Sequence, residues 1–311
     1  MTRVAQITHD YRHAGAMSDL IPLYGFVDDG VFLTKSGALG VVLALEGVDY
    51  ECLDPQQREA VTTRFEVALR LWDERTRLSQ YVLKRNRVVR PDDAHPHPAV
   101  DTVLRRRHAH LQAQQAELFT VSLYLVVVVD PDRPATAWAS EARRALRQPV
   151  ATSREWFSPA RTIVRLDDDL NRRRVQLRHK VDAFVQQLED TVAPRLLSKR
   201  DAFTFFRRLL NYTPEKADRI RLRHDTFLDY DSCDSALECH RTHLRLDDHY
   251  VRVLTLKEPP AHTFPLVFQA LYEIPSNLVL VSEWQREAQG AVRREIHRAA
   301  MPSGWPYRAT R

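Results

Sequence analysis

The sequence predicts an α+β protein with two lobes, in which largely antiparallel sheets are covered by amphipathic helices. Apolar runs of strand length alternate with stretches of helical spacing along the chain. Short turns join two pairs of these runs, as in β-hairpins. We expect a polar segment over residues 1–17, lobes over 18–166 and 167–300, and a tail over 301–311.

The first hairpin is predicted from two apolar runs, Val31–Thr34 and Leu39–Leu45. The turn Lys35-Ser36-Gly37 places a glycine where a tight reversal requires positive φ.

A helix is predicted to start after Asp54, because Pro55 suits a first turn and Gln57 completes a capping box. Its length should be about 20 residues. The core-facing residues are expected to be Val61, Phe65, Ala68 and Trp72.

Two strands and a helix complete the first half. Ser79–Val89 alternates weakly, which is typical of a strand at a sheet edge. A proline loop over 91–98 leads to a helix over Ala99–Gln115, and Asp101 is spaced to pair with Arg105. The helix should turn Val100, Leu104 and Leu111 inward. Phe119–Val129 is apolar on both faces and predicts a central strand, followed by a less regular stretch with a helix over 137–146.

The second half should open with a long helix whose amino end is Asp167-Asp168-Asp169. Ser198 and Asp201 form a capping box for a second helix. The apolar residues of the two helices are Leu177, Val181, Phe184, Leu188 and Val192, then Phe203, Phe206 and Leu210.

The remaining elements are a hairpin, a short helix, a strand and a last helix. Asp247-Asp248 is the turn of the hairpin. The hairpin strands are expected over 242–246 and 250–256. The short helix is expected over 265–272, the strand over 277–282, and the last helix from 283 to about 299.

Composition indicates a folded protein of a reducing compartment. Basic residues number 46 and acidic residues 41, for a net charge of +5, which is far from a disordered polyelectrolyte. The three cysteines are an odd count, which favours the cytoplasm over a disulfide framework. The start lacks the apolar stretch of a signal peptide, and the longest apolar run, Val121–Val129, is too short to span a bilayer. Any membrane contact should be peripheral.

Nucleotide hydrolysis has no support in the sequence. A phosphate loop needs glycines around a lysine and a hydroxyl residue. The chain has eight glycines, none between Val48 and Gln289, and no Gly-Lys-Ser or Gly-Lys-Thr. We therefore expect no cofactor and no enzymatic activity.

A weak metal-site candidate consists of Cys233, Cys239, His240 and His243. These are zinc-ligand residue types, but the interval from Cys233 to Cys239 is too wide for a zinc knuckle. We expect polar loop residues here and no metal.

Two arginine runs are the sharpest basic features, Arg105-Arg106-Arg107 and Arg172-Arg173-Arg174. Consecutive helical residues point about 100° apart, so three cannot line one groove. Asp168 and Asp169 are spaced to pair with Arg172 and Arg173. The runs are candidates for contact with an acidic protein or lipid headgroups, and specific DNA recognition is the less favoured alternative.

An ordered series of segments resembles the amino-terminal region of the TrbE/CagE-type ATPases of conjugation and type IV secretion, over roughly residues 20–298. The segments are Gly30-Val31, Lys35-Ser36-Gly37, Leu39-Gly40-Val41-Val42, Gly47 to Leu53, Leu246 to Leu256, and Ile274-Pro275 before Val279 to Ser282.

The resemblance implies a non-catalytic docking and assembly module at the cytoplasmic face of the inner membrane. Such a module would contact inner-membrane secretion components and position a motor domain, and it could form a homo-oligomeric collar. The family's phosphate-binding motifs match no position here, so we expect the motor to be separate or missing. The alternative is a basic nucleic-acid-binding protein that acts through its arginine-rich helices.

Overall fold

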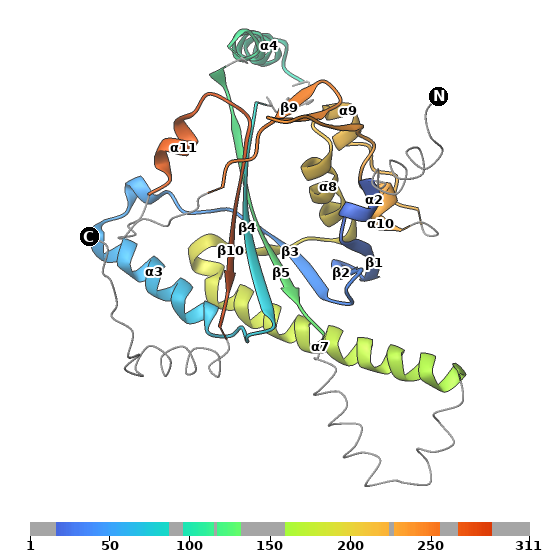
Figure 1. The fold of residues 1–311 in the computed structure, drawn as a ribbon. Helices are drawn as coiled ribbons and strands as arrows, with labels where there is room; N and C mark the ends of the chain where they lie inside the picture. Colours follow the sequence, from blue (N-terminus) through green and yellow to red (C-terminus); the bar gives the residue numbers. More distant parts are fainter. Residues whose placement is uncertain are drawn as a thin grey trace, which may run out of the picture.

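A seven-stranded antiparallel sheet is the centre of the fold in the computed structural model (Figure 1). The structure describes residues 17–86, 96–114, 117–131, 159–223, 227–255 and 267–287. The strand order is β1-β2-β3-β5-β4-β10, and β6 pairs with β3. The strands are β1 (Leu23–Asp28), β2 (Val31–Thr34), β3 (Leu39–Leu45), β4 (Thr76–Arg85), β5 (Thr120–Val129), β6 (Arg195–Leu196) and β10 (Leu278–Gln285).

Helices and a small second sheet surround the main sheet, so the α+β prediction is confirmed. The helices are α2 (Met17–Leu20), α3 (Pro55–Leu69), α4 (Pro98–Ala113), α7 (Pro159–Val192), α8 (Lys199–Leu210), α9 (Pro214–Ala217), α10 (Leu228–Asp231) and α11 (Gln269–Glu273), with a 3-10 turn at Tyr50–Cys52. The second sheet has the order β7 (Leu237–Cys239), β8 (Leu244–Leu246) and β9 (His249–Val251).

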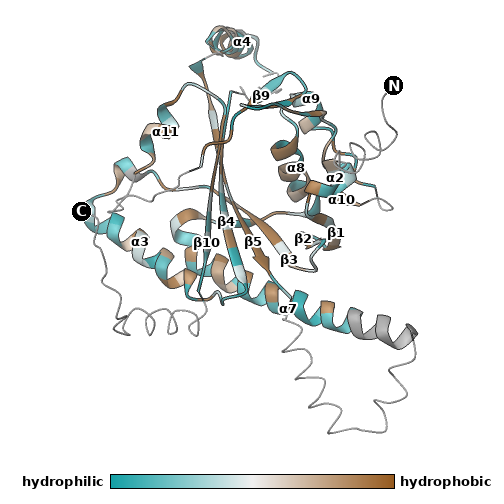
Figure 2. Ribbon diagram, viewed as in Figure 1, coloured by the Kyte–Doolittle hydropathy of each residue, from teal (hydrophilic) through white to brown (hydrophobic). Residues whose placement is uncertain are grey.

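The main sheet has a core on each face. On one face, α3 and α7 cover Val41 and Leu43, and the Trp72 ring packs 5.4 Å from that of Phe184. On the other, α8 covers Val42, and Phe206 meets Phe32 edge-on at 5.2 Å. The apolar colour of β3 and β5 in Figure 2 reflects their burial between these two layers.

The local predictions near the amino end are confirmed. Gly37 has a φ of +81° in the β2–β3 turn. Both hydrogen bonds of the Asp54–Gln57 capping box are present at the start of α3, although α3 has 15 residues and is shorter than expected. Trp72 lies just beyond the helix and is fully buried.

The prediction of an edge position for the strand after α3 is wrong. β4 lies between β5 and β10 and pairs with both along its length. Its alternation looked weak because both faces of an internal strand are covered, so Val82 and Leu83 are buried on opposite faces.

The ends of two predicted helices also differ. The last helix was expected from Glu283, but residues 283–285 belong to β10, where Trp284 is opposite Leu78. α7 begins at Pro159, so Asp167-Asp168-Asp169 lie inside it. The buried stripe of α7, from Leu177 to Val192, is as predicted.

The main sheet contains strands from both expected lobes. β6 and β10 come from the range 167–300, and the expected boundary after residue 166 falls within α7. The hairpin with Asp247-Asp248 as its turn is confirmed as β8–β9. The helix expected over 137–146 and most of the loop over 91–98 lie outside the described residues.

Candidate docking surface

Four large apolar side chains are exposed where α2, β1 and α10 meet, and we call them the α10 patch. They are Leu20, Tyr24, Phe227 and Tyr230. The Tyr24 and Phe227 rings lie 5.0 Å apart, and α10 contacts both α2 and β1. Leu20 is 72% exposed and Tyr230 is 64% exposed. Clustered side chains of this size mark interaction surfaces more often than single exposed ones do.

An ion pair with one buried partner holds the α10 patch against the sheet. Asp229 of α10 is buried and accepts from Lys35 Nζ at 2.8 Å. Lys35 lies in the β2–β3 turn and also donates to the carbonyl oxygen of Ser18 at 2.6 Å. One ammonium group therefore ties α2 and α10 to the same turn, so the patch is carried by anchored elements.

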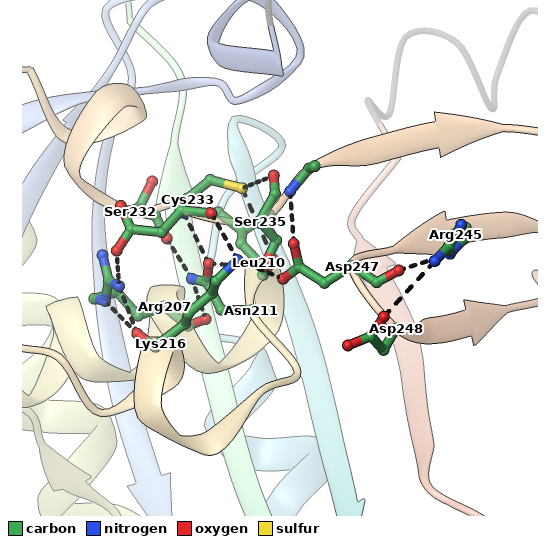
Figure 3. Close-up of polar contacts among 12 residues, drawn as sticks. Arg207, Leu210, Asn211, Lys216, Ser232, Cys233, Ser235, Arg245, Asp247 and Asp248 are labelled. Atoms are coloured by element: carbon green, nitrogen blue, oxygen red, sulfur yellow. Dashed lines mark hydrogen bonds and ion pairs between the residues drawn. The ribbon is translucent and has the colours of Figure 1, made fainter.

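A buried polar network below α10 joins α8 to the small sheet (Figure 3). Arg207 is almost fully buried, pairs with Asp234 at 2.6 Å and donates to the carbonyl oxygens of Lys216 and Asp231. Asn211 is also buried and donates to the carbonyl oxygen of Ser232 at 2.8 Å. These contacts fix the segment after α10 on the end of α8.

A shallow hollow of about 380 Å³ lies beside this network. Its charges are paired: Lys216 contacts Asp247 at 2.8 Å, and Arg245 contacts Glu238 at 3.5 Å and Asp248 at 3.7 Å. The hydrogen bond from Lys216 lowers the pKa of Asp247. Because each cation has an acidic neighbour and the acidic residues outnumber the basic ones, the hollow has no excess positive charge that would attract a phosphate. Its lining residues are Thr213, Lys216, Ala236, Glu238, Arg245, Asp247 and Asp248.

The run Arg172-Arg173-Arg174 is used mainly inside the molecule. Arg173 donates to the carbonyl oxygen of Gly37 at 2.8 Å, and burial lowers its pKa. Arg174 pairs with Asp28 at 3.1 Å. Arg172 is exposed and lies 3.8 Å from Asp169, three residues earlier instead of four. Two of the three arginines therefore hold α7 on turns of the sheet.

The run Arg105-Arg106-Arg107 lies on α4 and is exposed throughout. The predicted pair of Arg105 with Asp101 is present. The expectation that α4 turns Val100, Leu104 and Leu111 inward is met only in part, because Leu104 and Leu111 are half-buried, Val100 is exposed, and no residue of this helix is fully buried. Its apolar spacing shows which residues share a face but cannot show that a neighbour covers that face.

The four candidate metal ligands do not converge. Among the residues that the structure describes, no group of three or more His, Cys, Asp or Glu side chains could hold a metal ion. His240 and His243 stack at 4.7 Å, and Cys239 is exposed at the end of β7. Cys233 is half-buried, with its Sγ 3.6 Å from the carbonyl oxygen of Ser235, and burial raises its pKa.

Sequence reasoning did not predict the α10 patch. Leu20 and Tyr24 stand next to helix- and strand-forming residues, so they resembled ordinary core positions. The only local signal was that Phe227 and Tyr230 lie in a short segment outside any regular apolar pattern. Their meeting with Tyr24, about 200 residues away in the chain, depends on the fold.

Comparison with known proteins finds a similarity in the part of the chain that forms β2 to β5. The sequence model described as Type IV secretion system ATPase VirB4/TrbE, N-terminal domain, matches residues 30–136, a range that contains β2 to β5, α3 and α4. A search of curated proteins found no match. No helix within the described ranges combines the length and apolar character needed to cross a bilayer. Residues 30–136 are therefore similar to the amino-terminal domain of the VirB4/TrbE ATPases of type IV secretion systems.

Proposed function

We propose that this chain is a docking and assembly module of a type IV secretion ATPase, which positions the motor at the inner-membrane secretion complex. The α10 patch is the observation that carries this proposal. Tyr and Phe are enriched at protein interfaces because their rings bury a large area with few rotatable bonds. Here three such rings are exposed on elements that are anchored from below.

The proposed role is non-catalytic. The sequence has no phosphate loop, and the hollow has three acidic and two basic side chains, so it offers a triphosphate no excess positive charge. In the proposed arrangement, the phosphate-loop motor of the ATPase binds the α10 patch, and inner-membrane components bind elsewhere on the chain. Self-association into a ring is compatible with this arrangement.

The nucleic-acid-binding alternative is less well supported. It relied on two arginine runs acting together, but Arg173 and Arg174 contact Gly37 and Asp28 within the molecule. A nucleic-acid surface needs its cations gathered and available on one face.

The test is a binding titration between the purified full chain and the phosphate-loop motor domain of a TrbE-type ATPase from the same secretion system. The Tyr24→Ser, Tyr230→Ser double variant should weaken binding at least about tenfold, because an interface aromatic commonly contributes about 2 kcal/mol. Val281→Ser is the matched control, since Val281 is a similarly exposed side chain on β10.

Two results would overturn the proposal. One is equal binding by the double variant and the wild-type chain. The other is measurable ATP turnover by the purified chain, which would contradict a non-catalytic role.

A further inference from the structure

β1 and β10 form the two edges of the main sheet, and the edges differ in regularity (Figure 1). Two register shifts interrupt the pairing of β1 with β2, and α10 contacts β1. Irregular or covered edge strands are poor acceptors of a further strand. The β1 edge is therefore protected against strand addition.

The β10 edge has none of these protective features. All eight residues from Leu278 to Gln285 pair with β4 in continuous register. The strand contains no proline or lysine, and within the described ranges β4 is its only paired neighbour. Alternate residues of an antiparallel edge strand direct their N–H and C=O groups away from the sheet. The outer side of β10 can therefore pair with another strand.

The side chains of β10 differ between the two faces of the sheet. Trp284 packs against the core under α3 and α7, and Leu280 shares that face. Val279 packs against the core under α8, and Val281 and Glu283 share that face. A strand added beside β10 would therefore meet large apolar side chains on one face, and a carboxylate next to valines on the other.

Glu283 gives this edge a preference for positive charge. Its side chain is exposed and has no ion pair with a described residue. Burial and the charge of Glu283 raise the pKa of Tyr81 in β4, which is consistent with a carboxylate on the α8 face. Opposite charges on neighbouring strands stabilise their pairing. A basic residue opposite Glu283 is therefore the favourable choice.

A second copy of β10 does not supply that basic residue. An antiparallel self-pairing that keeps the two faces aligned places odd-numbered residues opposite odd-numbered ones. The odd-numbered residues of the strand are Val279, Val281, Glu283 and Gln285, and none of them is a cation. The charge of the edge therefore favours a different chain.

We propose that the β10 edge binds an extended segment of a partner protein by strand addition, and that this segment alternates apolar with basic residues. Main-chain hydrogen bonds supply the affinity, and a basic residue pairs with Glu283. The inference goes beyond the proposed function, because β10 and the α10 patch lie at opposite edges of the sheet.

The test is a fluorescence anisotropy titration of the full chain into a labelled peptide of the same length as β10, in which valine and lysine alternate. We expect saturable binding, and weaker binding when glutamate replaces lysine in the peptide. N-methylation of every backbone amide of the valine–lysine peptide should weaken binding at least about tenfold, because strand addition depends on main-chain donors. Amide hydrogen exchange of β10 should slow in the complex, while that of β1 stays unchanged.

The Glu283→Lys variant tests the charge preference. It should weaken binding of the valine–lysine peptide roughly fivefold and strengthen binding of the valine–glutamate peptide by a similar factor, since charge pairs on neighbouring strands have effects of this size. Glu59→Lys is the matched control, because it makes the same charge change at an exposed position on α3. It should leave both affinities near the wild-type values.

Three peptide results would overturn the inference: no binding of the valine–lysine peptide, equal binding of its N-methylated form, or equal effects of the two variants. A dimer of the free chain in which the β10 amides are already protected from exchange would assign the edge to a second copy, and would overturn it too. The motor titration is independent of these outcomes, because it varies Tyr24 and Tyr230 beside the other edge.

Discussion

Lys84 in β4 donates a hydrogen bond of 2.8 Å to the backbone carbonyl oxygen of Ile274, which follows α11. The same ammonium group donates to the carbonyl oxygen of Tyr272 and lies 4.4 Å from the centre of the Phe119 ring. Lys84 is buried, and its described contacts include no carboxylate. A buried cation thus joins the first half of the chain to the segment that leads into β10.

Replacement of this cation should destabilise the fold. Lys84→Met keeps the apolar stem but leaves two carbonyl oxygens without their donor, and we expect the free energy of unfolding to fall by about 2–3 kcal/mol. Urea unfolding followed by circular dichroism measures the change. Arg70→Met, at an exposed position, should change stability by less than about 0.5 kcal/mol. Equal stability of the two variants would contradict the role of Lys84.

Asn211 should control the attachment of the small sheet. Its amide donates to Arg207 and Ser232 carbonyl oxygens, and its Oδ1 accepts from the Asp234 N–H at 2.8 Å and the Ser235 hydroxyl at 3.1 Å. Asn211→Ala removes all four bonds and should cost about 3 kcal/mol.

Amide hydrogen exchange distinguishes a local effect of Asn211→Ala from a global one. Exchange should accelerate first in β7, β8 and β9, while the β3–β5 pairing keeps its protection. Uniform acceleration over both sheets would show that Asn211 does not act on the small sheet in particular.

Asp73 should make stability depend on pH in the acid range. Partial burial raises the pKa of Asp73, but hydrogen bonds from Lys180 and Thr76 outweigh this effect and lower the pKa from 3.8 to about 2. The unfolded chain therefore binds this proton at higher pH than the folded chain does. The stabilisation is complete above about pH 4 and is lost as the pH falls towards 2.

The expected contribution of Asp73 is about 1 kcal/mol, because its side chain is 36% exposed and solvent screens the pair with Lys180. Unfolding free energies measured between pH 5 and pH 2 should show this loss in the wild-type chain. Asp73→Asn should remove the corresponding part of the slope. An unchanged slope in that variant would refute the assignment.

Gly30 and Gly37 should respond differently to alanine. Both have positive φ, +82° and +81°, so a side chain adds backbone strain of about 1 kcal/mol at either position. A Cβ at Gly30 would also lie 2.4 Å from the carbonyl oxygen of Leu197, whereas at Gly37 it would meet nothing within 4 Å.

Gly30→Ala should therefore cost about 3 kcal/mol and Gly37→Ala about 1 kcal/mol, since only the first forces a backbone shift. Thermal unfolding of the two variants compares them directly. Similar melting temperatures would mean that the contact with Leu197 relaxes without cost.

Features that depend on neighbouring residues were determined by the sequence alone. The Asp54–Gln57 capping box, the glycine at the β2–β3 turn and the buried stripe of α7 each follow from groups within a few residues or a few helical turns of one another. Their geometry is set by backbone dihedrals and by helical periodicity, which act locally. The same locality made the β8–β9 hairpin predictable from its turn.

Only the tertiary structure decided which distant segments meet. The pairing of β10 with β4, the contact of Tyr24 with Phe227 and the incomplete burial of α4 have no local signature in the sequence. Apolar spacing shows that a face is suited to burial, but the neighbour that buries it is chosen by competition among all segments of the chain. In α4, Leu104 and Leu111 are only half-buried, and Val100 and Val103 remain exposed.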